Sequence, residues 1–442
     1  MAISLGFHIV FTCIGMTMPW LMAFAEWRFM RSGEALYRDL SKLWSKCVAV
    51  FFAVGAVSGT VLSFELGLLW PTFMQHAGPI IGLPFSWEGT AFFLEAIAIG
   101  LFLYGWERLP RPAHFASGIV VGLSGVASGV LVIAANGWMN SPRGFRWEGG
   151  RAVDVDPIAA MFNAAWLSEA IHMVIAAFIS TGFGVAGLHA WRLLRGKTPE
   201  LHRTGMRFAL GMGAIAALVQ PLSGDFSAKD VAKRQPAKLA AMEAHYHTQA
   251  SAPIAIGGIP DDEQRRLIGA IHIPYLLSFL AHGDPQAVVI GLDQVPRDEW
   301  PPTLICHLAF QTMVGLGSLL ALIGLGFLAL RMLRPRWLDH PRFLRGIALC
   351  SPLGFVAVEA GWTVTEVGRQ PWIIYGVMRT RDAVSPMPGL VWPLSSIVIV
   401  YAILSVVTWF VSARLIHAFE RGLAASPRAA PGPLVPEPAA HG

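Results

Sequence analysis

Charged residues are scarce in this chain of 442 residues. Asp, Glu, Lys and Arg make up only 14% of it, whereas hydrophobic residues make up 54%. A soluble protein of this length carries roughly a quarter charged residues, so the composition excludes an ordinary soluble enzyme. Several apolar runs approach or exceed the roughly 20 residues that cross a bilayer. The sequence therefore predicts an all-α, polytopic integral membrane helix bundle.

Cysteine motifs are also missing. The four cysteines, Cys13, Cys47, Cys306 and Cys350, are scattered along the chain. They form no CxxC pair and no disulfide framework, and the lack of CxxCH excludes a covalently attached c-type haem. The first apolar run has no basic segment before it and continues to Trp27, so we predict no cleavable signal peptide. The net charge of +5 comes from basic loops and does not indicate a nucleic-acid partner.

What the sequence has in abundance is apolar segments, of which we predict nine as transmembrane helices. They cover about 4–26, 47–69, 82–106, 116–137, 166–190, 206–223, 303–330, 346–366 and 390–415. The predicted organisation is residues 1–223 with six helices, a long connection over 224–302, and residues 303–417 with three helices. A tail over 418–442, rich in Ala and Pro, is expected to be disordered.

Loop charge predicts the orientation of these helices. The connections 27–46, 107–115, 191–207 and 331–345 carry five, two, five and five Lys and Arg. The short connections on the opposite side, 70–81, 138–165 and 367–389, carry none, three and three. The positive-inside rule therefore predicts an N-terminus outside and a C-terminus in the cytoplasm.

Few ionisable residues lie within the predicted spans, and intramembrane charges are commonly functional. They include His8, Glu88, Glu95, Glu169, His172, His189, His307, Glu359 and Glu366, with Met313 as a soft ligand candidate. The orientation predicts His8 about one turn from the outer surface, Glu88 and His172 one to two turns, and Met313 about three. With Glu366 at an outer helix end, the candidates converge on the outer half of the bundle.

Four of these residues are candidate ligands of haem iron. His172 and Met313 suit the two axial positions of one haem, a closed arrangement that favours electron transfer. The alternatives are a histidine bonded to a helix neighbour and a methionine filling the core. His8 is a candidate for a second haem with an open face, or a polar contact near the interface. Glu366 is a candidate iron ligand, or simply the ion-pair partner of Arg369.

Two further pairs suggest proton chemistry and ligand binding. Glu88 and Glu95 are two helical turns apart and share one face, which favours a proton path over capped or water-bound residues. In the long connection, Lys238 and Glu243 are five positions apart and could bond the two ends of a polar ring. The alternative, which the spacing alone favours, is a solvated amphipathic helix over 237–246.

These residues, in this order, resemble subunit I of the cytochrome bd quinol oxidases over nearly the whole chain. The matching motifs are His8, the run Glu88 to Glu95 continuing to Arg108, Asn136 to Met139, His172, Gly224-Asp225, Lys238 to Glu243, Phe310 to Met313, and Glu359 to Trp362 through Gly368-Arg369-Gln370-Pro371-Trp372. The last motif, beside the membrane residue Glu366, is highly specific.

The resemblance implies a terminal respiratory oxidase of the bacterial inner membrane with three haems. His172 and Met313 would bind a low-spin haem b. His8 and Glu366 would serve a high-spin haem b and a haem d, the latter replaced by haem b in some members. Glu88 would lie beside the high-spin pair.

The resemblance also implies roles for other residues and for partners. Glu95 would lie on the proton route from the cytoplasm, Arg369 would neutralise a haem propionate, and Trp362 would lie between haems. Lys238 and Glu243 would belong to an outer loop that oxidises ubiquinol or menaquinol before oxygen is reduced to water, without proton pumping. A second membrane subunit, and in some members a small single-helix subunit, would complete the enzyme.

The sequence departs from some members of that family in two ways. The 224–302 connection is short, as in a branch that includes cyanide-insensitive oxidases, and position 311 is Gln where some members have Arg. Two rival hypotheses remain at this point. One is a haem b electron-transfer subunit that does not reduce oxygen, and the other is a proton-coupled transporter using Glu88, Glu95 and Glu366.

Overall fold

The computed structural model describes residues 1–385 and 387–425. Within them, nine helical spans are long and apolar enough to cross a membrane. They are α1 (Ala2–Ser32), α2 (Ala35–Leu69), α3 (Pro71–Tyr104), α4 (Arg111–Asn140), α6 (Trp166–Leu194), α7 (Pro199–Arg234), α10 (Thr303–Leu333), the pair α11 (Pro341–Cys350) and α12 (Leu353–Val367), and α14 (Val391–Ala425). The predicted all-α membrane bundle is confirmed.

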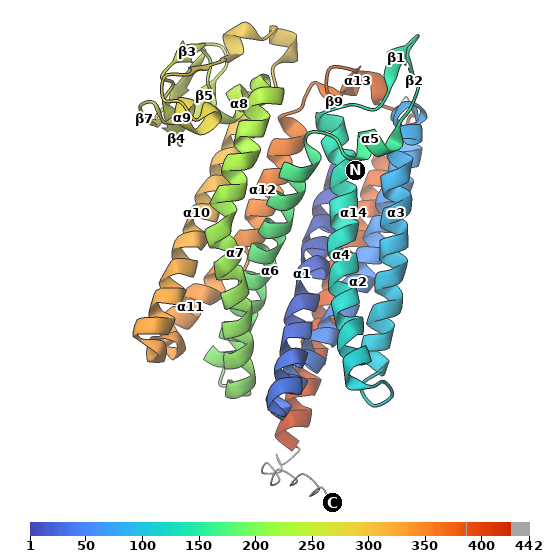
Figure 1. Cartoon of the computed structure of the whole chain (residues 1–442), viewed down its shortest axis with the longest axis vertical. Helices are drawn as coiled ribbons and strands as arrows, with labels where there is room; N and C mark the ends of the chain where they lie inside the picture. Colours follow the sequence, from blue (N-terminus) through green and yellow to red (C-terminus); the bar gives the residue numbers. More distant parts are fainter. Residues whose placement is uncertain (386, 426–442) are drawn as a thin grey trace, which may run out of the picture.

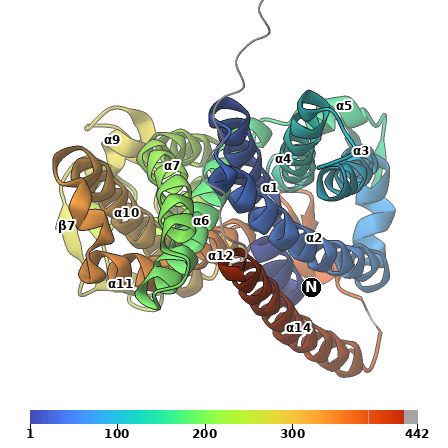
Figure 2. The ribbon, with the colours of Figure 1, turned by 90° about the horizontal axis from the view of Figure 1, so that it is seen from below.

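The spans form two groups of helices (Figures 1 and 2). Helices α1, α2, α3 and α4 pack together in one group, while α6, α7, α10, α11 and α12 form the other. Contacts of α6 with α1 and α4 join the two groups, and α14 lies along α2. Glycines allow close crossings, since a Cβ on Gly182 of α6 would come within 2.6 Å of the Gly213 Cα on α7.

The eighth span is broken, although the sequence predicted one helix over 346–366. It divides at Ser351 and Pro352 into α11 and α12. Proline has no N–H to donate and its ring clashes with the preceding turn, so it interrupts the helix. Beyond the break, α12 lies against α6, because a Cβ on Gly354 would meet Ser180 Cα at 2.5 Å. The break therefore sets the course of the segment that ends at Glu366.

Short strands and helices cover one end of the bundle, the end at which the N-terminus lies (Figure 1). Each sheet is an antiparallel pair: β1 (Arg146–Glu148) with β2 (Arg151–Val153), β3 (Gln249–Ala250) with β8 (Val288–Val289), β4 (Ile254–Ile256) with β7 (Ile271–Ile273), β5 (Ile259–Asp261) with β6 (Arg266–Ile268), and β9 (Trp372–Ile374) with β10 (Met378–Arg379). The short helices there are α5 (Pro157–Met161), α8 (Pro236–Glu243), α9 (Leu276–His282) and α13 (Thr380–Ala383), with the 3₁₀ turns η1 (Leu292–Gln294) and η2 (Arg297–Glu299). A third turn, η3 (Pro335–Asp339), precedes α11.

Several helices extend beyond the predicted spans. Helix α2 begins at Ala35, α3 begins at Pro71, and α7 continues to Arg234, eleven residues into the predicted 224–302 connection. Helix α14 continues to Ala425, so the predicted tail from residue 418 begins as helix, and its remainder from 426 lies outside the described residues. Hydropathy marks only the part of a helix that matches the bilayer, whereas backbone hydrogen bonding continues into polar turns.

Candidate functional site

Glu366 lies in the last turn of α12 and is held from two sides. Arg369 Nη2 donates to its Oε2 at 2.7 Å, and Asn136 Nδ2 of α4 donates to its Oε1 at 2.6 Å. The ion pair considered for Glu366 and Arg369 is therefore present. Each carboxylate oxygen has a second lone pair, so the pair and a ligand role for Glu366 are compatible.

Arg369 has hydrogen-bonding capacity to spare. Its residue is 1% exposed, and its Nε and Nη1 have no hydrogen-bond partner among the described residues. Buried guanidinium N–H groups without a partner are costly, and their planar arrangement matches a carboxylate. The two donors thus fit the propionate of a haem, the group expected at this position.

His8 on α1 has its ring fixed by Ser58 of α2. The Ser58 hydroxyl donates to the backbone carbonyls of Val54 and Gly55, so it accepts the proton of His8 Nδ1 at 2.8 Å. This bond assigns the proton to Nδ1 and leaves a lone pair on Nε2. A histidine oriented in this way by a second residue suits a metal ligand.

His172 on α6 is oriented in the same manner. Ser223 of α7 donates to the Gln220 carbonyl at 2.9 Å and therefore accepts from His172 Nδ1 at 3.1 Å. The lone pair on His172 Nε2 faces the Gln220 side-chain amide, whose Nε2 is 3.1 Å away. Gln220 was not predicted from the sequence, and its Oε1 has no partner within the described part of the chain. Iron ligation by His172 would require the Gln220 side chain to turn aside.

Glycines lie against three of the candidate ligands and leave their side chains uncrowded. A Cβ on Gly59 would approach the His8 ring at 3.1 Å, and one on Gly361 would approach the Met313 sulfur at 3.0 Å. A Cβ on Gly224 would make only an ordinary contact with His172, at 3.6 Å. The two Nε2 lone pairs and the Arg369 donors together fit haem, once Gln220 turns away from His172. Trp362, one residue from Gly361, packs among apolar side chains of α1 and α6.

Glu88 and Glu95 both face α4, as their two-turn spacing predicted. Ser128 Oγ donates to Glu88 Oε1 at 2.9 Å, and a Cβ on Gly125 would be 3.6 Å from Glu95 Oε1. The depth of Glu88 below the outer surface differs from the one to two helical turns predicted from the sequence. Ser128 is eight residues from Asn136, the partner of Glu366, so Glu88 lies roughly 12 Å deeper along α4 than Glu366. The reason is that α3 begins eleven residues before its predicted start.

Lys238 and Glu243 lie on α8, which is shorter than the predicted helix over 237–246 and is buried rather than solvated. Lys238 is 4% exposed, and its Nζ donates to Asn140 Oδ1 at 2.8 Å. Burial lowers the pKa of Lys238 to about 8 and raises the pKa of Glu243 to about 8. Five positions correspond to a rotation of roughly 140°, so the two side chains leave α8 in different directions.

Polar side chains of α10 fasten the long connection to the bundle. Gln311 accepts from Gly257 N at 3.0 Å and donates to Ala255 O at 2.9 Å, which holds the β4–β7 hairpin. The His307 ring nitrogens face the carbonyls of Met242 and Gly257 at 2.8 and 3.2 Å. The structure thus gives the Gln at position 311 a docking role that the sequence did not predict.

Further polar residues lie at the site, although no sequence motif assigned them to it. Asn140 on α4 contacts Lys238, Asn136 and Glu169. Glu359 on α12 lies near Gly6 of α1, whose Cβ would be 3.1 Å from Glu359 Oε2. Glu169 and Glu359 were noted as intramembrane ionisable residues, but no motif pointed to Asn140, because an asparagine near a helix end is usually a cap.

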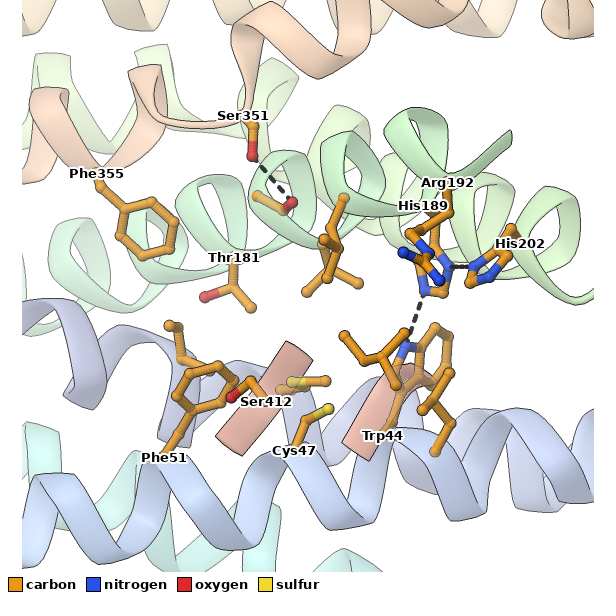
Figure 3. Close-up of a pocket in the computed structure, with 17 residues that line it drawn as sticks. Trp44, Cys47, Phe51, Thr181, His189, Arg192, His202, Ser351, Phe355 and Ser412 are labelled. Atoms are coloured by element: carbon orange, nitrogen blue, oxygen red, sulfur yellow. Dashed lines mark hydrogen bonds between the residues drawn. The ribbon is translucent and has the colours of Figure 1, made fainter. Parts of the chain in front are cut away.

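A cavity of about 210 Å³ lies at the other end of the bundle and includes none of the candidate ligands (Figure 3). Trp44 Nε1 donates to His189 Nε2 at 3.1 Å, and His189 Nδ1 lies 2.8 Å from His202 Nδ1. His202 in turn bonds Glu420 at 2.9 Å. Because Trp44 can only donate, neutral histidines satisfy every bond in this chain. The cluster connects α2, α6, α7 and α14 and is structural.

Comparison with known proteins identifies what these residues belong to. Residues 1–419 match the family model described as cytochrome bd terminal oxidase subunit I. A putative cytochrome bd menaquinol oxidase subunit I of Bacillus subtilis is 35% identical over 92% of this chain and 93% of its own length. Subunit 1 of the cytochrome bd-II ubiquinol oxidase of Escherichia coli is 29% identical over 87% of this chain and 88% of its own.

A solved structure agrees with the sequence comparison. The bd oxidase from Geobacillus thermodenitrificans superposes with a TM-score of 0.90 at 35% identity, covering 94% of this chain and 96% of that one. The resemblance that the ordered motifs indicated is confirmed, and the chain belongs to the cytochrome bd terminal oxidase subunit I family.

Proposed function

We propose that this chain is the subunit of a terminal respiratory oxidase that oxidises quinol and reduces dioxygen to water. Family membership supports the quinol:oxygen oxidoreductase activity, since the relatives are menaquinol and ubiquinol oxidases by name. The observation that carries the proposal in this chain is the buried Arg369, paired with Glu366 and retaining two nitrogens, Nε and Nη1, that have no hydrogen-bond partner among the described residues.

The ring orientations of His8 and His172 support a ligand role for these two histidines. His172 and Met313 would bind a low-spin haem b, and His8 and Glu366 would serve a high-spin haem b and a haem d or its haem b replacement. When bound, these haems supply electron transfer and oxygen reduction. Ser58 and Ser223 hold the two histidine rings in the tautomer that presents Nε2. Arg369 compensates negative charge beside Glu366 and a propionate.

Proton delivery would use the face of α3 that meets α4. Glu95 lies deeper than Glu88, and Ser128 bonds the upper carboxylate. The carboxyl groups of Glu88 and Glu95 lie at two depths, and the Ser128 hydroxyl lies beside Glu88. Such groups can hold a proton and pass it on inside a membrane. We place the lower end of this path on the cytoplasmic side, following the loop charges.

Quinol would bind at α8 on the opposite, outer side. Lys238 offers N–H groups to a quinol oxygen, and Glu243 accepts a quinol proton when it is ionised. Protons from quinol would leave outside and protons for water would enter from the cytoplasm, so charge is separated without a pump. We propose that the chain lies in the bacterial inner membrane with its N-terminus outside, in keeping with the loop charges. A second membrane subunit, with or without a small single-helix subunit, would be its partner.

The rival hypotheses are not favoured by the comparisons, and spectroscopy separates all three. We expect the purified complex to be coloured and its reduced spectrum to shift with carbon monoxide. A colourless protein would support the transporter, and haem spectra insensitive to carbon monoxide would support the electron-transfer subunit.

His172→Ala tests the ligand assignment directly. We expect quinol-dependent oxygen uptake to fall to background and the low-spin haem signal to disappear, because neither water nor alanine replaces an axial imidazole. His282→Ala is the matched control, since His282 is exposed on α9. Uptake that survives in His172→Ala would refute the assignment.

A further inference from the structure

Asn140 is the point at which three parts of the molecule meet. It ends α4, is 3% exposed, and lies one helical turn beyond Asn136, the partner of Glu366. Its Nδ2 donates to Asn136 Oδ1 at 3.1 Å and to Glu169 Oε1 at 3.2 Å. Its Oδ1 accepts from Lys238 Nζ at 2.8 Å. The side chain therefore joins α4, α6 and α8.

The same residue also fixes the start of α8. Gln235, 3% exposed and the residue before α8, donates from Nε2 to the Asn140 backbone carbonyl at 2.9 Å. The Gln235 carbonyl in turn accepts from Lys238 N at 3.0 Å. Lys238 is thus held twice, through its ammonium group by the Asn140 side chain and through its backbone by a helix turn anchored on Asn140.

An amide suits this position better than other polar groups would. Asn140 needs a donor toward the Glu169 carboxylate and an acceptor toward the Lys238 ammonium, and an amide presents both. A carboxylate would repel Glu169, and a hydroxyl is too short to span the two. Glu169 Oε2 is buried and has no partner within the described residues, and the hydrogen bond to Glu169 Oε1 comes from Asn140, so Asn140 connects the carboxylate to the Lys238 ammonium.

We propose that Asn140 is a positioning residue of the quinol site, which orients Lys238 for the substrate and links it through Asn136 to Glu366. One ammonium N–H is used by Asn140, and the remaining two are available to a quinol oxygen. This inference rests on the proposed function, because it takes Lys238 as a quinol-binding residue.

The test is a double-mutant cycle between Asn140→Ala and Lys238→Met. Alone, Asn140→Ala should raise the KM for a short-chain ubiquinol or menaquinol on the order of tenfold, the effect of losing one charge-assisted hydrogen bond, with kcat nearly unchanged. In the Lys238→Met background it should change KM by less than about twofold, because residues in one network act non-additively. Binding of the oxidised short-chain quinone, followed by protein fluorescence, should weaken in parallel.

Asn163→Ala is the matched control. Asn163 is also a buried asparagine near the same end, but it donates to Ala134 O and accepts from Ala165 N, away from Lys238. Its effects should add to those of Lys238→Met. Asn140→Asp keeps the acceptor for Lys238 and should restore quinone binding in part, which covers the case in which Asn140→Ala fails to fold.

The outcomes separate the inference from the proposed function. If Lys238→Met leaves quinol KM unchanged, the quinol-site assignment itself fails. If Lys238→Met raises KM but Asn140→Ala does not, or acts additively with it, the positioning role of Asn140 is overturned and the quinol site stands.

Discussion

At the scale of single residues, the site centres on an ion pair between a buried guanidinium and a partly exposed carboxylate. Arg369 is fully enclosed while its partner Glu366 is about one-third exposed, with side-chain exposures of 0% and 31%. A buried guanidinium without its carboxylate is an uncompensated charge, so the pair must be kept or lost as a unit. Asn136 adds a second contact that fixes the Glu366 carboxylate toward α4.

Arg369→Ala should therefore destabilise the protein and reduce its haem content. The expected loss of stability is smaller than the about 3–5 kcal/mol of a fully buried pair, because the Glu366 carboxylate that remains is about one-third exposed and keeps its hydrogen bond from Asn136. Arg369→Lys keeps the charge but not the planar fork and should recover stability more than haem retention. Thermal unfolding and pyridine haemochrome content measure the two effects. Arg379→Lys, at a pair reaching the partly exposed Glu299, should change neither.

The pKa values of the α8 residues predict the pH dependence of quinol oxidation. Burial raises the pKa of Glu243 to about 8, so below that pH its carboxyl is protonated and cannot accept a quinol proton. We expect kcat/KM for quinol to rise with pH up to about 8. Above it, Lys238, whose pKa burial lowers to about 8, loses its charge and the rate falls.

Substitution assigns each limb of this pH profile. Glu243→Gln should remove the rising limb and leave the falling one, while Lys238→Met should do the reverse. A rising limb that persists in Glu243→Gln would show that another group accepts the proton.

At the scale of helices, the sequence predicted which segments cross the membrane but not where they end. The apolar run from Cys47 onward gave no sign that the helix begins at Ala35, because the turns between are polar and carry no hydropathy signal. The histidine and carboxylate candidates were predictable because charge is rare in apolar helices. Asn140, Gln220 and Gln311 were not, since neutral amides are common and their roles depend on partners from distant elements.

Helix α14 is fastened to the second helix group by a buried ion pair that Arg192 forms with Glu420. Arg192 Nε donates to Glu420 Oε1 at 2.7 Å, and His202 shares the same oxygen. Glu420→Ala should lower the apparent Tm and cost about 3–5 kcal/mol, because Arg192 remains buried without a carboxylate. Asp154→Ala, which breaks the exposed pair with Arg146, should cost less than about 1 kcal/mol. Equal shifts in Tm would contradict the structural role of the cluster.

At the scale of the whole molecule, residues along helix α4 contact both the proposed quinol site and the proposed proton path. Positions along α4 therefore give the distance between the two. Asn140 contacts the candidate quinol residue, Asn136 the candidate iron ligand, and Ser128 and Gly125 the two carboxylates of α3. From Asn140 to Gly125 is roughly 22 Å of helix. Helix α4 therefore spans from the proposed quinol site at its C-terminal end to the proposed proton path at its middle, and the two processes would use different parts of it.

Substitutions at the level of the middle of α4 should consequently change turnover and not quinol binding. We expect Glu95→Gln to lower kcat for oxygen uptake at least about tenfold with an unchanged quinol KM, because an amide cannot carry the proton. Ser128→Ala should slow turnover less. Ser86→Ala, an exposed serine on α3 that bonds only its own helix, is the control. An increase in quinol KM for Glu95→Gln would argue against a separation of the proton path from the quinol site.

The hydrogen bonds of Gln311 connect the long loop to the helix turn that carries Met313. Gln311 holds the β4–β7 hairpin by hydrogen bonds to Ala255 and Gly257, and Met313 lies two residues further along the same turn of α10. Because one helical turn carries both residues, we predict that a substrate which displaces the β4–β7 hairpin would also shift Met313, so substrate docking would be sensed at the candidate iron ligand.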